Sequence, residues 1–225
     1  MNATVLLLAD GRFPSGGHAH SAGAEAAIGA GDVSDHASLE RFVEGRLLTT
    51  GVVDAAFAAA SAQHCANLAA ARFDVLAAEY VARTASARLR QISLSLARQL
   101  LRAGARTWPS PLFAACDTAT GGRTPQPIAM GVVAAAAGCS AHDAALCELH
   151  HLVGAMTSAG VRLLGLDPFE ISAIAARLAP TLDALAAQAA ASATDDPATL
   201  PAGVALLHDV LAEHHATWEV RLFAS

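Results

Sequence analysis

Residues 86–106 read SARLRQISLSLARQLLRAGAR, and this stretch decides the fold class. A helix drawn through it has an apolar face formed by Leu89, Ile92, Leu96 and Leu100. The opposite face carries the basic side chains Arg88, Arg98, Arg102 and Arg106. Because apolar residues that recur every three or four positions are typical of an amphipathic helix, the stretch predicts one long helix, which Pro109 and Pro111 end.

The same spacing continues on both sides of this helix, and the alternation typical of strands is missing. It predicts helices at about 4–9, 21–30, 38–49, 53–69, 71–82, 128–137, 141–164, from 168 onward, and at 203–216. We expect Ser38 and Ser140 to be N-caps, Gly165 to stop a helix and Pro180 to kink or divide one. Residues 117–126 are predicted to be a loop and the best candidate for disorder, and 192–201 a linker. Residues 1–225 should therefore form a single all-α domain, a bundle of roughly eight to ten helices.

The charge balance excludes several classes of protein. All 14 basic residues are arginine, so the lysine of a P-loop and any catalytic lysine are missing. The net charge of −6 argues against nucleic-acid binding. Only 15% of the residues are charged, and this low share indicates either a surface partly covered by a partner or an alanine-rich protein from a GC-biased genome.

The cysteines and the apolar runs indicate a cytoplasmic protein. Cys65, Cys116, Cys139 and Cys147 form no CxxC pair and are interpreted as small buried hydrophobes in a reducing cytosol. No signal peptide is predicted at the start of the chain. The longest apolar stretch, 130–139, is too short to span a bilayer, so no membrane contact is expected.

The stretch 10–25 combines turn-forming residues with histidines. Pro14 and the Gly16–Gly17 pair predict a tight turn. Ser21 can cap the following helix, and Gly23 permits close approach of another backbone. His18 and His20 form an HxH pair that could bind a transition metal, although a polar turn with surface histidines is the simpler interpretation.

The remaining histidines and cysteines do not form a catalytic pattern. Cys147, His150 and His151 share a helix face and are interpreted as packing residues. His208, His214 and His215 are interpreted as solvated residues of a helix surface. No HExxH, GxSxG or Cys/His nucleophile pattern is present, so the chain is not expected to be an enzyme.

Residues 10–25 resemble the N-terminal signature of the UreF family, D-x-x-x-P-x-G-G-x-x-H-S-x-G-x-E. The matching positions are Asp10, Pro14, Gly16, Gly17, His20, Ser21, Gly23 and Glu25. The sequence departs at His18, where an aromatic residue is usual, and at Ala24, where a larger aliphatic residue is usual.

Three further segments resemble the family in the same order along the chain. Residues 96–102 are similar to its central helix, with Ala97 in place of a frequent glycine. Residues 149–167 resemble its A-x-R-L-x-x-L-G helix, and 209–225 resemble its terminal H-x-x-x-x-x-R-L-F-x-S. The resemblance therefore spans nearly the whole chain.

This resemblance implies an all-α homodimeric scaffold without chemistry of its own. It implies binding to UreD (also called UreH) and to the GTPase UreG, docking on apo-urease, and GTP-dependent nickel insertion. Nickel would pass through the complex without being held stably, and GTP would be bound by UreG only. Residues 1–20 would form the N-terminal helix and Gly-rich loop, and 217–225 the partner-binding tail. The candidate partner-binding residues are Pro14, Gly16, Gly17, His20, Ser21, Gly23, Glu25, Arg98, Arg102, Trp218, Arg221, Leu222 and Phe223.

Two other functions are compatible with the residues. The chain could be a stand-alone all-α metal-binding protein or enzyme that uses His18 and His20 as ligands. It could also be a helical regulator that binds nucleic acid through its arginine stripe, against which the acidic net charge argues. The stripe itself could be a solvated face or a docking surface for an acidic partner.

Overall fold

The computed structural model describes residues 3–223, without the side chains of His18 and Ala70, and it has no strand in that range. The first half contains α1 (Ala3–Ala9), α2 (Ala24–Ala30), α3 (His36–Arg46), α4 (Val52–Cys65), α5 (Phe73–Ala82) and α6 (Ala87–Thr107). The second half contains α7 (Pro111–Thr120), α8 (Gln126–Ala136), α9 (Ala141–Leu164), α10 (Pro168–Ala191) and α11 (Leu206–His215). The predicted all-α fold is confirmed.

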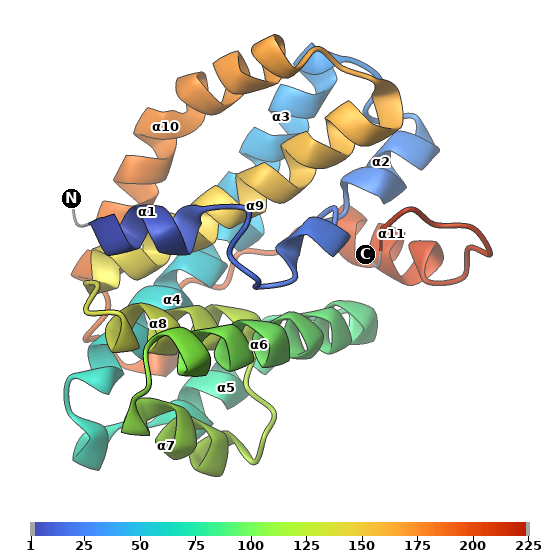
Figure 1. Cartoon of the computed structure of the whole chain (residues 1–225). Coiled ribbons are helices and arrows are strands. Elements are labelled where there is room, and N and C mark those ends of the chain that lie inside the picture. The colour runs from blue at the N-terminus through green and yellow to red at the C-terminus, as the bar shows by residue number, and fades with distance from the viewer. Residues whose placement is uncertain (1–2, 224–225) are drawn as a thin grey trace.

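The central helix is α4, which packs against α8, α9 and α10. Its alanines contribute to three separate apolar clusters. Ala55 and Ala59 belong to the first cluster, Ala58 and Ala62 to the second, and Ala56 and Ala60 to the third. Helices α3 and α10 lie on one side of α9, and α5, α6 and α7 lie on the other (Figure 1). A helix that is apolar all around belongs in the middle of a core, and α4 is such a helix.

The closest approach in this core joins α4 and α8 at Gly131. A Cβ atom at Gly131 would lie 2.4 Å from the Ala58 carbonyl oxygen and 2.7 Å from the Ala62 backbone nitrogen. The neighbouring Ser61 hydroxyl donates a 2.8 Å hydrogen bond to the Ile128 carbonyl. The two backbones are therefore in direct contact, which glycine and alanine alone permit.

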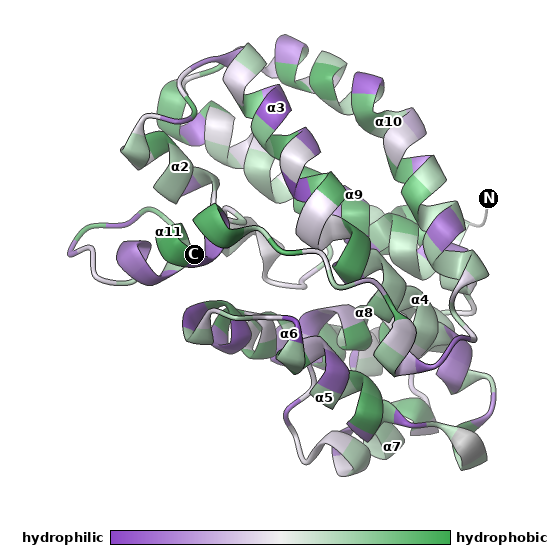
Figure 2. Cartoon of the chain, turned by 180° about the vertical axis from the view of Figure 1, so that it is seen from behind, coloured by the Kyte–Doolittle hydropathy of each residue, from purple (hydrophilic) through white to green (hydrophobic). Residues whose placement is uncertain are grey.

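Helix α6 has the amphipathic form expected from its sequence, and Figure 2 shows polar and apolar sides along it. The Ser86 hydroxyl accepts a 3.1 Å hydrogen bond from the Leu89 backbone nitrogen and so caps the helix. The helix packs on α8, where Gly104 fits beside Val133. The arginines at 98, 102 and 106 point to the outside and are exposed.

Local signals placed most helix ends correctly, but two caps were misassigned. Gly23, and not Ser21, is the N-cap of α2. Ser140 caps α9, Gly165 ends it in a left-handed conformation, and Asp167 caps α10. Ser38, however, is not the N-cap of α3. Asp35 is the N-cap, and Ser38 is the third helical residue, whose hydroxyl completes a capping box with Asp35.

The largest correction concerns residues 117–126, which are not a loop throughout. Helix α7 covers Pro111–Thr120, and the chain turns through Gly121 and Gly122 before α8 begins. Ser110 caps α7 and Pro111 occupies its first turn. This proline therefore follows the end of α6 and also begins α7. Leu112 and Cys116 of α7 are buried in the cluster around Phe57.

Two further segments differ from expectation. Helix α10 is not divided, because it runs through Pro180 from Pro168 to Ala191. Pro180 has no N–H group to donate to the Ala176 carbonyl. Both residues are exposed, so water can donate a hydrogen bond to that carbonyl instead. The linker 192–201 contains a short turn, Pro197–Thr199, which is held by the Arg83 guanidinium through the carbonyls of Pro197, Ala198, Leu200 and Pro201.

The contact at Gly131 gives a direct test of this packing. Gly131→Ala should lower the free energy of unfolding by about 1–3 kcal/mol or more, because its methyl group would overlap the Ala58 carbonyl. Gly154→Ala is the control, because nothing lies within 4 Å of a Cβ atom there, and it should be neutral or stabilise by up to about 1 kcal/mol. Urea unfolding of both variants measures the difference, and equal stability would contradict the close approach.

Candidate functional site

The Gly-rich loop between α1 and α2 lies against α6. The Phe13 ring stacks on Trp108 with ring centroids 5.6 Å apart. Gly16 has a left-handed φ of 83°, and a Cβ atom there would lie 2.4 Å from Gln99 Oε1. The left-handed turn therefore favours glycine at position 16, and the Gln99 side chain of α6 packs directly against it.

This contact brings two sets of predicted residues together. Pro14 of the loop and the arginines of α6 line one surface groove of about 520 Å³. We call it the arginine groove, and its lining is Pro14, Ser95, Arg98, Gln99, Arg102, Ala103 and Arg106. Its three guanidinium groups make no hydrogen bond or ion pair with any other described residue.

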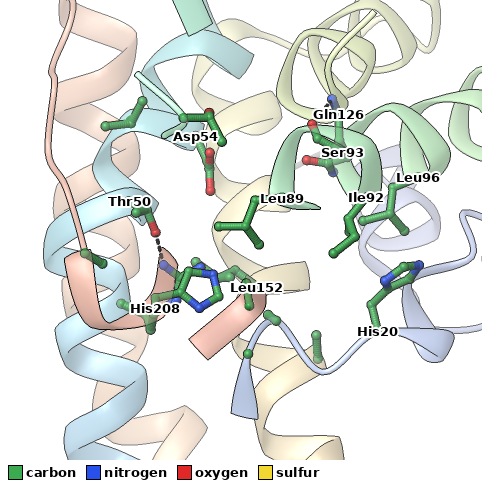
Figure 3. A pocket seen from close by; sticks show the side chains of 18 of the residues that line it. His20, Thr50, Asp54, Leu89, Ile92, Ser93, Leu96, Gln126, Leu152 and His208 are labelled. Carbon is green, nitrogen blue, oxygen red and sulfur yellow. Dashed lines mark hydrogen bonds between the residues drawn. The ribbon is translucent and has the colours of Figure 1, made fainter. Parts of the chain in front are cut away.

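The opposite, apolar face of α6 borders a partly open cavity of about 190 Å³. Leu89, Ile92 and Leu96 point into it, and His20 of the loop lies at one side (Figure 3). The His20 side chain is buried. His20 is thus an internal residue, whereas the side chain of His18 lies outside the described residues.

Polar groups reach the cavity from a deformed helical segment. The run Leu47–Gly51 between α3 and α4 is a π-helical turn, a deviation often found at functional sites. Arg46, Thr50 and Asp54 all line the cavity, and the Arg46 guanidinium donates a hydrogen bond to the Thr50 hydroxyl. Arg46 Nε has no partner among the described residues. The cavity therefore contains a buried positive charge.

Two carboxyl groups face the same space, that of the buried Glu148 and that of the half-buried Asp54. The Tyr80 hydroxyl donates a 2.8 Å hydrogen bond to Asp54 Oδ1, and Gln126 Nε2 donates a 2.9 Å bond to Glu148 Oε2. Burial raises the pKa of Asp54 to about 6, although the Tyr80 hydrogen bond and the Arg46 charge lower it. Burial and the charge of Asp54 raise the pKa of Glu148 well above its usual range, although the Gln126 hydrogen bond lowers it. Such groups could exchange protons or contact a passing cation.

Two of the three α11 histidines are buried, which corrects the expectation for His208 and His215, whereas His214 is exposed as expected. His208 and His215 are 7% and 2% exposed. Burial, and then the Arg46 charge, lower the pKa of His208 well below its usual value. A Cβ atom at Gly23 would lie 2.5 Å from the His208 ring, so Gly23 makes room for it.

Glu25 joins the N-terminal signature to the C-terminal tail. Its backbone nitrogen donates to the Ser21 hydroxyl, at 3.2 Å, as α2 begins. Its carboxylate accepts hydrogen bonds from the backbone nitrogens of Leu222, at 2.7 Å, and Phe223, at 3.0 Å. Oε2 also lies 2.9 Å from His215 Nε2. One buried carboxylate thus holds residues nearly 200 positions away.

The tail 217–223 has a buried side and an exposed side. Phe223 is 3% exposed and lies beneath the Arg162 guanidinium, 4.4 Å from the ring centroid. Trp218 packs on His215, with ring centroids 4.8 Å apart, and against Gly29. Val220, Arg221 and Leu222 are exposed. Residues 224–225 of the predicted tail lie outside the described residues.

The predicted site residues therefore separate into two groups. Pro14, Arg98 and Arg102 meet in the arginine groove, whereas Ser21, Gly23 and Glu25 lie with the tail and α11. His20 and Gly17 line the cavity between these groups. The sequence interpretation missed the cavity residues Arg46, Asp54, Glu148 and His208. A charged residue within an alanine- and valine-rich run, as in VVDAAF, is the signal that could have identified Asp54.

The cysteines and the remaining histidines do not come together in a metal site. Cys147 is buried beside the Val5 carbonyl and His151 lines the cavity, whereas His150 is exposed. All four cysteines are free thiols. Within the described part of the chain, no group of three or more His, Cys, Asp or Glu side chains could hold a metal ion. A metal role for His18 with His20 stays a prediction, since the His18 side chain is not described.

Comparison with known proteins identifies one family throughout. The UreF family model matches residues 33–179. Proteins named urease accessory protein UreF from Mycolicibacterium vanbaalenii and Mycobacterium sp. strain JLS are each 38% identical, over 99% of this chain and 98% of theirs. The protein of the same name from Mycobacterium tuberculosis strain H37Rv is 34% identical over the same shares.

The role of Glu25 can be tested by hydrogen exchange. Glu25→Gln places an amide donor against a backbone donor of the tail, which destabilises the tail contact by about 1–3 kcal/mol. Hydrogen exchange at the backbone amides of Leu222 and Phe223 should therefore accelerate roughly tenfold or more. Amides of α4 and α8 should keep their protection. Glu40→Gln, which removes a surface ion pair with Arg177, should leave the tail unchanged. Equal tail exchange in the Glu25 variant would show that the carboxylate does not hold it.

Proposed function

This chain belongs to the UreF family of urease accessory proteins, and we propose that it is a non-catalytic scaffold that, with UreD and the GTPase UreG, inserts nickel into apo-urease in a GTP-dependent step. The relatives are named as accessory proteins, and this chain is an accessory factor, not an enzyme. GTP is bound by UreG alone in this proposal, because this chain has no lysine for a P-loop.

The observation that carries the proposal is the distribution of exposed apolar side chains. Of the twelve large apolar residues exposed in the described chain, half lie between 204 and 222. They are Val204, Leu206, Leu207, Val210, Val220 and Leu222. A stretch of exposed apolar residues favours contact with another protein. We assign UreD to this C-terminal surface, which follows the family resemblance of residues 209–225.

The buried side of the tail supports this assignment. Glu25 and Phe223 fix the tail backbone, so Val220 and Leu222 are presented to solvent from a held segment. A preordered segment loses less conformational entropy on binding than a free one. Trp218 and Phe223 therefore support the tail, whereas Val220, Arg221 and Leu222 are placed to contact UreD.

The remaining parts of the proposal concern assembly and location. The protein forms a homodimer and acts in the cytoplasm, where its free thiols stay reduced. Within residues 3–223, no helix has the combined length and apolarity needed to cross a bilayer. Size-exclusion chromatography with light scattering tests the dimer, which a monomeric mass for the purified chain would contradict.

Assembly can be tested by placing charges on the exposed side of the tail. The wild-type chain, co-expressed with UreD and UreG, should give a ternary complex that activates urease when nickel and GTP are supplied. Val220→Asp/Leu222→Asp should lose both complex and activation, because two carboxylates would be desolvated in the interface. Helical content and melting temperature should not change, because both side chains are exposed.

Val81→Asp is the matched control, since Val81 is an exposed apolar residue on α5, away from the tail. It should assemble normally. A double-aspartate variant that still forms the ternary complex would remove the tail from the UreD interface. A wild-type chain that neither assembles nor activates urease would overturn the scaffold function itself.

Nickel transfer through His18 and His20 is a separate part of the proposal. Imidazole is a good nickel ligand, and His20 lies beside the cavity. His18→Ala/His20→Ala should lower the nickel content of urease matured in the complete system, with the ternary complex intact. His142→Ala controls for loss of a histidine elsewhere. An unchanged nickel content of urease matured with the double variant would show that His18 and His20 do not take part in nickel transfer.

A further inference from the structure

The arginine groove gathers three exposed arginines on this acidic protein. Helix α6 contains five arginines and no acidic residue, although the chain has 20 Asp and Glu residues. Arg98, Arg102 and Arg106 are exposed and without a partner in the described chain. Four other arginines do form ion pairs in the described chain: Arg12 with Asp10, Arg72 with Asp74, Arg83 with Glu79 and Arg177 with Glu40.

The three arginines are regularly spaced along a fixed helix. They lie at i, i+4 and i+8 of one helix, so neighbours are about 6 Å apart along the axis and the row is about 12 Å long. Like charges at this spacing repel one another and give no benefit to the isolated helix. The helix that carries them is fixed, because its buried residues Ala97, Leu100 and Gly104 lie where α6 packs on α8.

The Gly-rich loop supplies the second wall of the groove. Pro14 lines it, and the loop is held in place by the Phe13–Trp108 stack and by Gly16 against Gln99. A ligand in the groove would contact both the N-terminal signature and the arginine row. The site is thus a preformed concave surface with a row of guanidinium groups.

We propose that the arginine groove binds an acidic segment of a protein partner in the urease-maturation assembly, and this inference rests on the proposed function. Guanidinium groups form paired hydrogen bonds with carboxylates, and a helix with Asp or Glu at every fourth position matches the spacing of the row. The surface is distinct from the apolar C-terminal surface assigned to UreD. A scaffold with one apolar and one basic surface binds two chemically different partners at the same time.

Nucleic acid is a less suitable occupant. The row is about 12 Å long and the chain is acidic as a whole, whereas nucleic-acid sites spread many basic residues over a longer footprint. Binding of a DNA duplex is therefore compared with binding of an acidic peptide.

The test measures binding of purified UreD, UreG and apo-urease, each offered separately to the immobilised full chain at about 50 mM and about 200 mM salt. Arg98→Gln/Arg102→Gln/Arg106→Gln should weaken one of these partners roughly tenfold or more at low salt, and the wild-type affinity should fall as salt rises. The corresponding triple lysine variant keeps the charge but loses the paired hydrogen bonds, so its affinity should lie between those of the wild type and the triple glutamine variant. Arg41→Gln/Arg123→Gln/Arg177→Gln changes the net charge equally at exposed positions elsewhere and should bind as the wild type does.

A second probe makes the inference independent of the scaffold function. A fluorescent glutamate-rich peptide should bind the wild-type chain and not the triple glutamine variant. If none of the three proteins binds the wild type, the proposed function fails, and the peptide result alone then supports or overturns the groove. The inference is overturned if every partner that binds the wild type binds the triple glutamine variant equally well. Tighter binding of a DNA duplex than of the peptide would also overturn it.

Discussion

The contact between α4 and α8 at Gly131 is the constraint on which the other features depend. With backbone against backbone at this point, α8 lies deep in the molecule and offers its other side to α6. The alanines of α4 make this possible, because no longer side chain would leave room for three helices around it. The position of α6, and hence of the cavity and the arginine groove on its two faces, follows from that approach.

Helix α6 separates two kinds of chemistry. Its leucines and isoleucine face a cavity in which burial has moved the pKa values of Asp54, Glu148 and His208 away from their usual ranges. Arg98, Arg102 and Arg106 face solvent on its other side, whereas Arg88, which the sequence placed on the same basic face, lines the cavity. One amphipathic helix therefore borders a largely buried site on one side and an exposed basic groove on the other. The loop from Asp10 to His20 contacts both, through His20 on the inside and Pro14 on the outside.

Sequence reasoning succeeded where a signal is local. The long helices α6 and α9 were predicted, and so was the Ser140 cap of α9, because it acts on a residue three positions away. It failed at α7, where Pro111 was interpreted only as the end of a helix. It also failed for His208 and His215, since their burial depends on Gly23 and Glu25, which lie far away in the sequence. The residues that the family signature supplied, Gly16, Gly23 and Glu25, have clear physical roles that the pattern alone did not reveal.

The hydrogen bonds of Glu25 also have a consequence for synthesis of the protein. The carboxylate is made early, but its donors at Leu222 and Phe223 follow 197 and 198 residues later. A nascent chain on the ribosome therefore has the signature loop and most of the bundle while the Glu25 carboxylate still lacks these donors. The surface formed by residues 204–222 reaches its final shape only after translation has passed Phe223. Incomplete chains thus cannot present the finished tail, so the assembly machinery would engage only molecules whose helical bundle is already complete.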